Sequence, residues 1–159
     1  MICSRQAPVL RWVLFLQRDI TAVSRENVLT DKESICIVGI GDDGLEGLTA
    51  STVSIIRQAD LLVGPRDLTA SFQTDVGDTW DPGSDYEALS IRIDATTDHK
   101  VVILAAGDPL FYGTARFLCE RIGKARIRVI PNVSTMQLAF ARVKENWDDL
   151  FIVTKDWIK

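Results

Sequence analysis

The amino-acid sequence predicts an α/β domain built on a parallel sheet of about five strands with flanking helices. Short apolar runs such as 101–105 (VVILA) are bounded by charged residues or by glycine and proline turns. Runs of this kind are typical of strands that are buried on both faces of a parallel sheet. Segments with apolar residues at helical spacing alternate with the runs four times, which predicts right-handed crossovers between parallel strands.

The composition narrows the class of protein. The chain has 159 residues, of which 47% are hydrophobic and 25% charged, as expected for one soluble globular domain. A net charge of −4 argues against a nonspecific nucleic-acid-binding protein. No apolar run approaches the roughly 20 residues of a membrane span, and we expect no targeting segment. Three scattered cysteines and one histidine predict no metal site, and reduced thiols in the cytoplasm.

Residues 1–34 differ in character from the domain proper, which we place at 35–159. Apolar side chains recur at helical spacing in this N-terminal extension, at Val9, Trp12, Val13, Leu16 and Ile20. The extension is therefore either a short amphipathic helix packed on the domain or on a partner, or a loosely ordered leader. The polar, linker-like stretch that follows favours the leader.

Within the domain, strands and helices are expected to alternate in order. The predicted strands are 35–38, 61–63, 101–105, 127–130 and 151–153. The predicted helices are 48–59, 86–95, a helix from Phe111 to Ile122, and a helix that begins at Ser134. Ser134 and Gln137 have the spacing of a capping box, and residues 80–83 (WDPG) are typical of a turn.

The first turn with possible chemistry follows the first strand and contains Gly39, Gly41 and Gly44. Glycines at such a turn let the backbone approach a ligand closely. The G-x-G-x-x-G spacing is that of a dinucleotide site, but Asp42 and Asp43 place negative charge where a pyrophosphate would lie. A cationic or zwitterionic ligand and a simple βα turn both stay open as interpretations.

Two later turns also have alternative interpretations. Asp108 either orients a ligand hydroxyl or amine, or caps the helix predicted after it. Asn132 follows a proline where a tight turn is needed, and we expect it to adopt a positive φ. Ser134 and Thr135 offer hydroxyl groups to a ligand at the next helix start, where Ser134 also serves as the cap.

Taken together, four segments resemble the tetrapyrrole (corrin and porphyrin) methyltransferase family. They are GIGDDGLEGLT (39–49), GPRDL (64–68), AAGDPLFYG (105–113) and PNVSTMQLAFAR (131–142). The most similar branch methylates C5 of precorrins in cobalamin biosynthesis. That branch contains a stand-alone C5 methylase and a precorrin-6Y C5,15-methyltransferase with a separate decarboxylating domain. The resemblance covers residues 35–150.

The resemblance implies a cleft between two α/β domains that holds S-adenosylmethionine. By residue matching, the cofactor would contact Gly41, Asp42, Ala106, Gly107, Asp108, Leu110, Phe111, Ser134 and Thr135. Asp43 and Arg66 are assigned to the substrate, although Arg66 is equally well explained as a solvated loop residue. No catalytic side chain and no metal ligand are assigned. We expect the second methylase domain of the family to be absent from this chain, so that it contributes half of the cleft.

The implied reaction is transfer of a methyl group to ring carbon C5 of a precorrin or cobalt-precorrin. Positioning would supply most of the rate, because the ring carbon is electron-rich and the leaving group is neutral. The expected partners are the tetrapyrrole substrate and, in a homodimer, a second copy of the chain, without nucleic acid or membrane. The alternatives are another tetrapyrrole methylase, a diphthine synthase, and a non-catalytic truncated half-domain.

Overall fold

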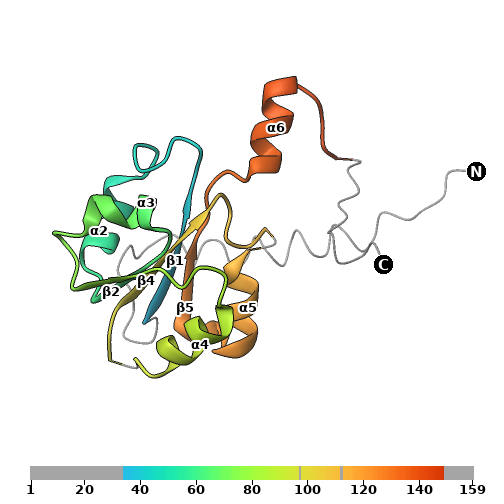
Figure 1. The fold of residues 1–159 in the computed structure, drawn as a ribbon. Coiled ribbons are helices and arrows are strands. Elements are labelled where there is room, and N and C mark those ends of the chain that lie inside the picture. The colour runs from blue at the N-terminus through green and yellow to red at the C-terminus, as the bar shows by residue number, and fades with distance from the viewer. Residues whose placement is uncertain (1–33, 97, 112, 149–159) are drawn as a thin grey trace, which may run out of the picture.

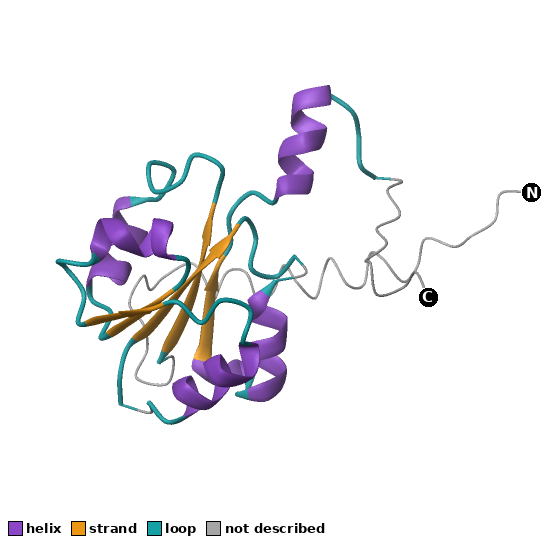
Figure 2. Cartoon of the chain, viewed as in Figure 1, coloured by secondary structure: helices purple, strands orange, loops and turns teal. Residues whose placement is uncertain are grey.

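A five-stranded parallel sheet with helices on both faces forms the body of the protein (Figures 1 and 2). The computed structural model describes residues 34–148, apart from positions 97 and 112. The strands are β1 (Ile35–Ile40), β2 (Leu61–Val63), β3 (Asp78–Trp80), β4 (Val101–Ala106) and β5 (Ile127–Ile130). Their order in the sheet is β3-β2-β4-β1-β5, and each pairing is parallel. The predicted fold class is confirmed.

The helices divide between the two faces of the sheet. They are α2 (Ala50–Arg57), α3 (Arg66–Thr69), α4 (Tyr86–Asp94), α5 (Thr114–Arg121) and α6 (Thr135–Val143), with short 3-10 turns η1 (Ala70–Phe72) and η2 (Lys124–Arg126). Helices α2 and α3 cover one face, and α4 and α5 cover the other (Figure 1).

The central strands supply side chains to two separate cores. Ile35 and Ile37 of β1 belong to the core under α4 and α5, whereas Cys36 and Val38 belong to the core under α2. Successive side chains of a strand point to opposite faces, so a strand that is covered on both sides must be apolar throughout. This explains the continuous apolar runs in the sequence.

Four predicted strands lie where the sequence places them, and the fifth, 151–153, lies outside the described residues. The fifth strand of the observed sheet is β3, which was not predicted. β3 lies at the edge of the sheet, where one face of a three-residue strand contributes little to the core. An edge position of this kind requires no apolar run, and the sequence carries none there.

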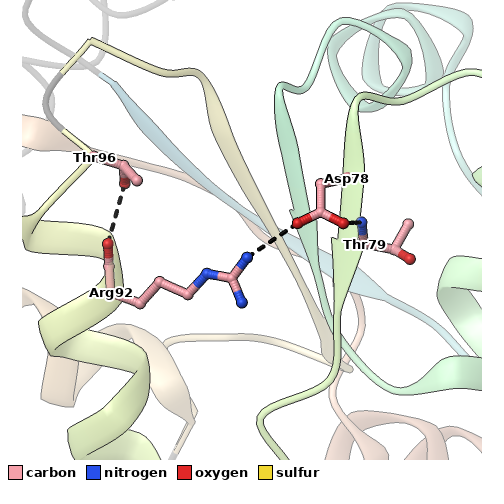
Figure 3. Close-up of polar contacts among 4 residues, drawn as sticks. All are labelled: Asp78, Thr79, Arg92 and Thr96. Atoms are coloured by element: carbon pink, nitrogen blue, oxygen red, sulfur yellow. Dashed lines mark hydrogen bonds and ion pairs between the residues drawn. The ribbon is translucent and has the colours of Figure 1, made fainter.

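β3 pairs with β2 in the sheet, and a polar contact also joins it to α4 (Figure 3). The guanidinium Nη2 of Arg92 donates to Oδ2 of Asp78 at 3.0 Å, and the backbone N–H of Thr79 donates to Oδ1 at 2.9 Å. The Arg92 guanidinium also lies 4.6 Å from the centre of the Trp80 ring. A single arginine therefore pairs with one β3 side chain and stacks on another.

Helix α5 begins at Thr114, so the predicted start at Phe111 is wrong. The residues before it fold into a tight turn, in which a Cβ at Gly113 would collide with the backbone of Pro109. The N-cap is Gly113, without a side-chain hydrogen bond to the helix. The interpretation of Asp108 as the cap of this helix is therefore also wrong. Its Oδ1 instead accepts the backbone N–H of Leu110 at 2.9 Å.

Helix α6 extends away from the sheet (Figure 1) and has no buried residue. Its predicted capping box is confirmed. Oγ of Ser134 accepts the backbone N–H of Gln137 at 3.3 Å, and the side-chain Oε1 of Gln137 accepts the backbone N–H of Ser134 at 2.9 Å. Because few tertiary contacts hold α6, this cap is its main source of local order.

We expect Ser134→Ala to loosen α6 without unfolding the domain. Loss of an N-cap serine costs about 1 kcal/mol, which corresponds to roughly fivefold weaker protection of the helical amides. Native-state hydrogen exchange over residues 135–143 measures this effect. Thr135→Ala is the matched control, because its exposed side chain makes no capping hydrogen bond. Equal loss of protection in both variants would contradict the capping role.

Candidate functional site

The loops that follow β1, β4 and β5 meet at one edge of the sheet. In a parallel sheet the loops after all strands lie at the carboxyl edge, where α/β proteins bind their ligands. The backbone N–H of Gly107 donates to the carbonyl oxygen of Ile40 at 2.6 Å. The side-chain Nδ2 of Asn132 donates to the carbonyl oxygen of Gly39 at 3.2 Å. The structure thus brings together the three turns singled out in the sequence.

Gly39 lies at the centre of this junction. A Cβ at position 39 would collide with the carbonyl oxygen of Gly107 and lie 2.8 Å from the backbone nitrogen of Asn132. Gly107 itself has a φ of +64°, in the left-handed region that favours glycine, and packs beside the backbone of Ser134. Backbone atoms from three strand ends are therefore in contact, which only a glycine at position 39 permits.

The expectation that Asn132 adopts a positive φ is wrong. Among the described non-glycine residues, Lys144 at the end of α6 is the one with a positive φ. Asn132 acts through its side chain instead: Oδ1 accepts the backbone N–H of Val133 at 2.8 Å while Nδ2 bonds to Gly39. An asparagine is therefore required here as a clamp between two turns rather than for its backbone conformation.

The first loop closes on itself before α2 begins. The N–H of Gly44 donates to the carbonyl oxygen of Gly41 at 3.1 Å, which forms a tight turn. Asp42 forms an ion pair with Arg142 of α6, at 2.7 Å between Oδ2 and Nη2. The Asp43 carboxylate folds back over the loop, where it occupies the space that a Cβ at Gly47 would need. Both carboxylates are exposed and already have neighbours within the protein.

The β4 loop presents backbone and apolar groups at the same edge. Ala106 is exposed, and the side chain of Leu110 is 58% exposed. Asp108 is half-buried and uses Oδ1 to hold the turn, through the N–H of Leu110. The N–H of Phe111 closes the turn by donating to the carbonyl oxygen of Asp108 at 3.0 Å. The second carboxylate oxygen of Asp108, Oδ2, makes no hydrogen bond within the described part of the chain.

Ser134 and Thr135 differ in what they offer to a ligand. Ser134 is buried, and its hydroxyl both donates to Oε1 of Gln137 at 2.9 Å and accepts the backbone N–H of the same residue. Its side chain is therefore committed to the cap of α6. Thr135 is exposed at the first helical position and makes no capping bond. A ligand contact at this turn would accordingly come from Thr135 or from the backbone.

Sequence reasoning missed a groove that opens beside the β4 loop. Its volume is about 490 Å³, and its lining includes Pro65, Pro82, Tyr86, Ala106 and Gly113. The groove lies between the ends of β2 and β4 and the first residues of α4 and α5. Ala106 belongs both to the groove and to the residues assigned to the cofactor. The groove could have been expected if β3 had been predicted, because residues 80–83 would then follow a strand and lie at this edge of the sheet.

Arg66, the residue assigned to the substrate, lies at the same edge but outside the three-turn junction. It is exposed at the start of α3 and lines a second, smaller cavity.

No group of three or more His, Cys, Asp or Glu residues that could hold a metal ion occurs among the described residues. Nor does this part of the chain contain a helix long and apolar enough to cross a membrane.

The chain is thus a parallel α/β protein, the class of fold in which ligands bind at the carboxyl ends of the strands. Within this class, the chain belongs to the tetrapyrrole (corrin/porphyrin) methylase family, whose sequence model matches residues 34–155. The resemblance stated from the four sequence segments is confirmed.

Two relatives illustrate the similarity in sequence. The cobalt-precorrin-7 C(5)-methyltransferase of Salmonella typhimurium is 32% identical over 120 residues, which are 76% of this chain and 60% of that protein. The decarboxylating precorrin-6Y C(5,15)-methyltransferase of a Sinorhizobium species is 33% identical over 123 residues, 76% of this chain and 29% of that protein. This chain therefore matches little more than half of the first relative and under a third of the second.

Solved structures have the same fold. The precorrin-6Y methylase of Archaeoglobus fulgidus is 26% identical, with a TM-score of 0.57 over 70% of this chain and 59% of that one. The uroporphyrin-III C-methyltransferase of Thermus thermophilus, at 21% identity, has a TM-score of 0.56 over 74% of this chain and 55% of that one. At that identity the second likeness shows the fold alone.

Proposed function

We propose that this chain supplies the cofactor-binding half of an S-adenosylmethionine-dependent C-methyltransferase acting at C5 of a precorrin or cobalt-precorrin. The observation that carries the proposal is the junction of the β1, β4 and β5 loops, which contains most of the residues assigned to the cofactor. Relatives named for C5 methylation support the choice of substrate.

A homodimer and a cytoplasmic location stay predictions. Sedimentation would test the first, and cell fractionation the second.

The residues at the edge fit such a cofactor in part. The exposed residue Ala106 and the exposed apolar side chain of Leu110 suit the adenosine part of S-adenosylmethionine. Oδ2 of Asp108, which accepts no hydrogen bond from the described residues, suits a hydroxyl or ammonium group. Asp42 and Ser134 fit less well, since the first is paired with Arg142 and the second caps α6. Their side chains are therefore weaker candidates than the β4 loop.

The chain would contribute position rather than acid–base chemistry. S-adenosylmethionine supplies an electrophilic methyl group on a sulfonium, and its departure leaves a neutral thioether. The tight backbone junction at Gly39 fixes the β4 loop relative to the β1 loop, and thereby the orientation of whatever the loop binds. Holding two reactants in an attack geometry is a large source of rate on its own. The bond from the ring carbon to the methyl group forms as the carbon–sulfur bond of the sulfonium breaks, and the positive charge left on the macrocycle is lost as a proton to water, so the scheme assigns no proton transfer to a side chain at the junction.

Calorimetric titration with S-adenosylmethionine and S-adenosylhomocysteine tests the proposal. We expect micromolar binding by the full chain, and at least about tenfold weaker binding by Asp108→Asn, because a charge-assisted hydrogen bond is lost. The asparagine keeps an oxygen that can accept the N–H of Leu110, so the turn itself is preserved. Asp94→Asn is the matched control, since Asp94 pairs with Arg126 on the surface, away from the junction.

Binding no tighter than millimolar by the unaltered chain would overturn the proposal and favour the non-catalytic half-domain. Micromolar binding that Asp108→Asn leaves unchanged would keep the function and remove Asp108 from the site. Labelled S-adenosylmethionine with different tetrapyrrole acceptors would then separate C5 methylation from the activities of other family members.

A further inference from the structure

Asp42 and Arg142 join two elements of the ligand edge that lie 100 residues apart in the chain. Oδ2 of Asp42 is 2.7 Å from Nη2 of Arg142. Asp42 belongs to the β1 loop, and Arg142 lies in the last turn of α6, the helix that follows β5. β1 and β5 are neighbours in the sheet. The pair therefore connects the segments that follow two neighbouring strands, at the edge where α/β proteins bind their ligands.

The β1 loop contacts the segment after β5 at its base and at its tip. At the base, Nδ2 of Asn132 donates to the carbonyl oxygen of Gly39 at 3.2 Å. Asn132 also lies beside Gly41, because a Cβ at that position would come within 3.1 Å of its Oδ1. The tight turn from Gly41 to Gly44 then places Asp42 at the tip of the loop. The Asp42 carboxylate is the group through which this tip reaches α6.

α6 is anchored at its start and extends from there away from the sheet (Figure 1). Ser134, its N-cap, is buried beside Gly107, whereas no residue of Thr135–Val143 is buried. Residues 131–134 form neither helix nor strand, so no continuous element fixes the direction of α6. Arg142 lies about two turns beyond the anchored end, roughly 10 Å along the helix axis. A contact at that distance sets the direction of the helix.

Both connected elements present groups for the proposed cofactor. The β1 loop offers Gly41, and the start of α6 offers the exposed Thr135. A ligand that contacts both binds best when loop and helix already have the required relative orientation, since less ordering is then needed. We infer that Arg142 is a positioning residue that sets this orientation through Asp42 without touching the cofactor itself. The inference rests on the proposed function, and it reassigns the Asp42 carboxylate from the cofactor to Arg142.

The exposure of the pair determines how large its effect is. The side chains of Arg142 and Asp42 are 74% and 49% exposed, so water screens their attraction. An exposed ion pair biases an equilibrium by at most about fivefold. A direct charged hydrogen bond to a ligand contributes more, about tenfold or above. Removal of the pair should therefore weaken cofactor binding modestly, and less than removal of a carboxylate that touches the cofactor.

Calorimetric titration of the full chain with S-adenosylmethionine and S-adenosylhomocysteine tests the inference through a double-mutant cycle. Asp42→Asn and Arg142→Gln should each weaken binding about threefold, and the double variant also about threefold rather than about ninefold. Arg142→Lys keeps the positive charge and should bind within about twofold of the unaltered chain. The control pair, Arg57 and Asp75, is exposed and lies before β2 and β3, at the opposite edge of the sheet. Arg57→Gln and Asp75→Asn should each change affinity less than about twofold.

The signs of the changes separate positioning from a direct charge effect. S-adenosylmethionine has a positive sulfonium, so a direct charge effect would make Asp42→Asn weaken its binding and Arg142→Gln strengthen it. Positioning predicts that both variants bind more weakly, by the same factor for S-adenosylhomocysteine, whose sulfur is neutral. Tighter binding by Arg142→Gln, or losses that multiply in the double variant, would overturn the inference.

Hydrogen exchange in the ligand-free chain separates this inference from the proposed function. Asp42→Asn and Arg142→Gln should each lower the protection of the α6 amides by about threefold, because each releases the same end of the helix. Unchanged protection in both variants would overturn the inference whatever the titrations show. Micromolar binding with losses that multiply removes the inference and keeps the proposed function. No cofactor binding by the unaltered chain removes the proposed function and the positioning role together, even where the exchange shows that loop and helix are joined.

Discussion

Gly39→Ala should destabilise the domain by about 3 kcal/mol and weaken S-adenosylmethionine binding in the fraction that stays folded. The added methyl group would meet the carbonyl oxygen of Gly107 and the backbone nitrogen of Asn132. Forcing a methyl group into packed backbone costs about 1–3 kcal/mol or more, since no flexible side chain can move aside. For a chain of this size the melting temperature should fall by roughly 10 °C.

Gly47→Ala is the matched control for this substitution. The three atoms nearest to a Cβ at position 47 all belong to the carboxylate end of Asp43, which is exposed and can rotate away. Neither Gly39 nor Gly47 has a φ in the left-handed region, so the two variants differ in contacts and not in backbone strain. Thermal unfolding followed by circular dichroism, with calorimetry on the folded protein, compares them. Equal stability of the two variants would show that the junction is looser than the structure indicates.

The sequence predicts most of the sheet because burial on both faces leaves a clear pattern. Strands β1 and β4 are covered on both sides, so every residue from 101 to 104 is buried and apolar. β3 leaves no such pattern, since it lies at the edge and is held by the Arg92–Asp78 pair. Ion pairs between segments distant in the chain have no periodicity that a sequence alone would reveal.

The candidate site also has some features that the sequence predicts and others that it does not. The turns at Gly39, Gly107 and Asn132 were found because glycine and asparagine after apolar runs mark tight turns. Their convergence follows from the strand order β4-β1-β5, which depends on tertiary packing. The groove at Tyr86 was missed because its lining comes from elements far apart in the chain. The ion pair between Asp42 and Arg142 was missed for the same reason.

Ile93→Ala is the second substitution for which we expect a large effect, and α4 contains its own control. Ile93 is fully buried in the core under α4 and α5, whereas Ile91, in the same helix, is 65% exposed. Truncation of a buried isoleucine to alanine costs about 2–5 kcal/mol, from lost burial and the cavity that remains. The change in helix propensity is the same at both positions and therefore cancels in the comparison.

Urea unfolding should accordingly show a loss of about 3 kcal/mol for Ile93→Ala and a change within about 0.5 kcal/mol for Ile91→Ala. Position 93 lies at the far end of α4 from Tyr86, which lines the groove. Ligand affinities of the folded Ile93→Ala variant should therefore match those of the unaltered chain, in contrast to Gly39→Ala. A stability loss with unchanged affinity at position 93, and a loss of both at position 39, would separate the residues that hold the sheet together from those that build its ligand edge. If Ile93→Ala and Gly39→Ala instead lowered ligand affinity to a similar extent, the affinity would depend on the stability of the core and not on the contacts at the Gly39 junction.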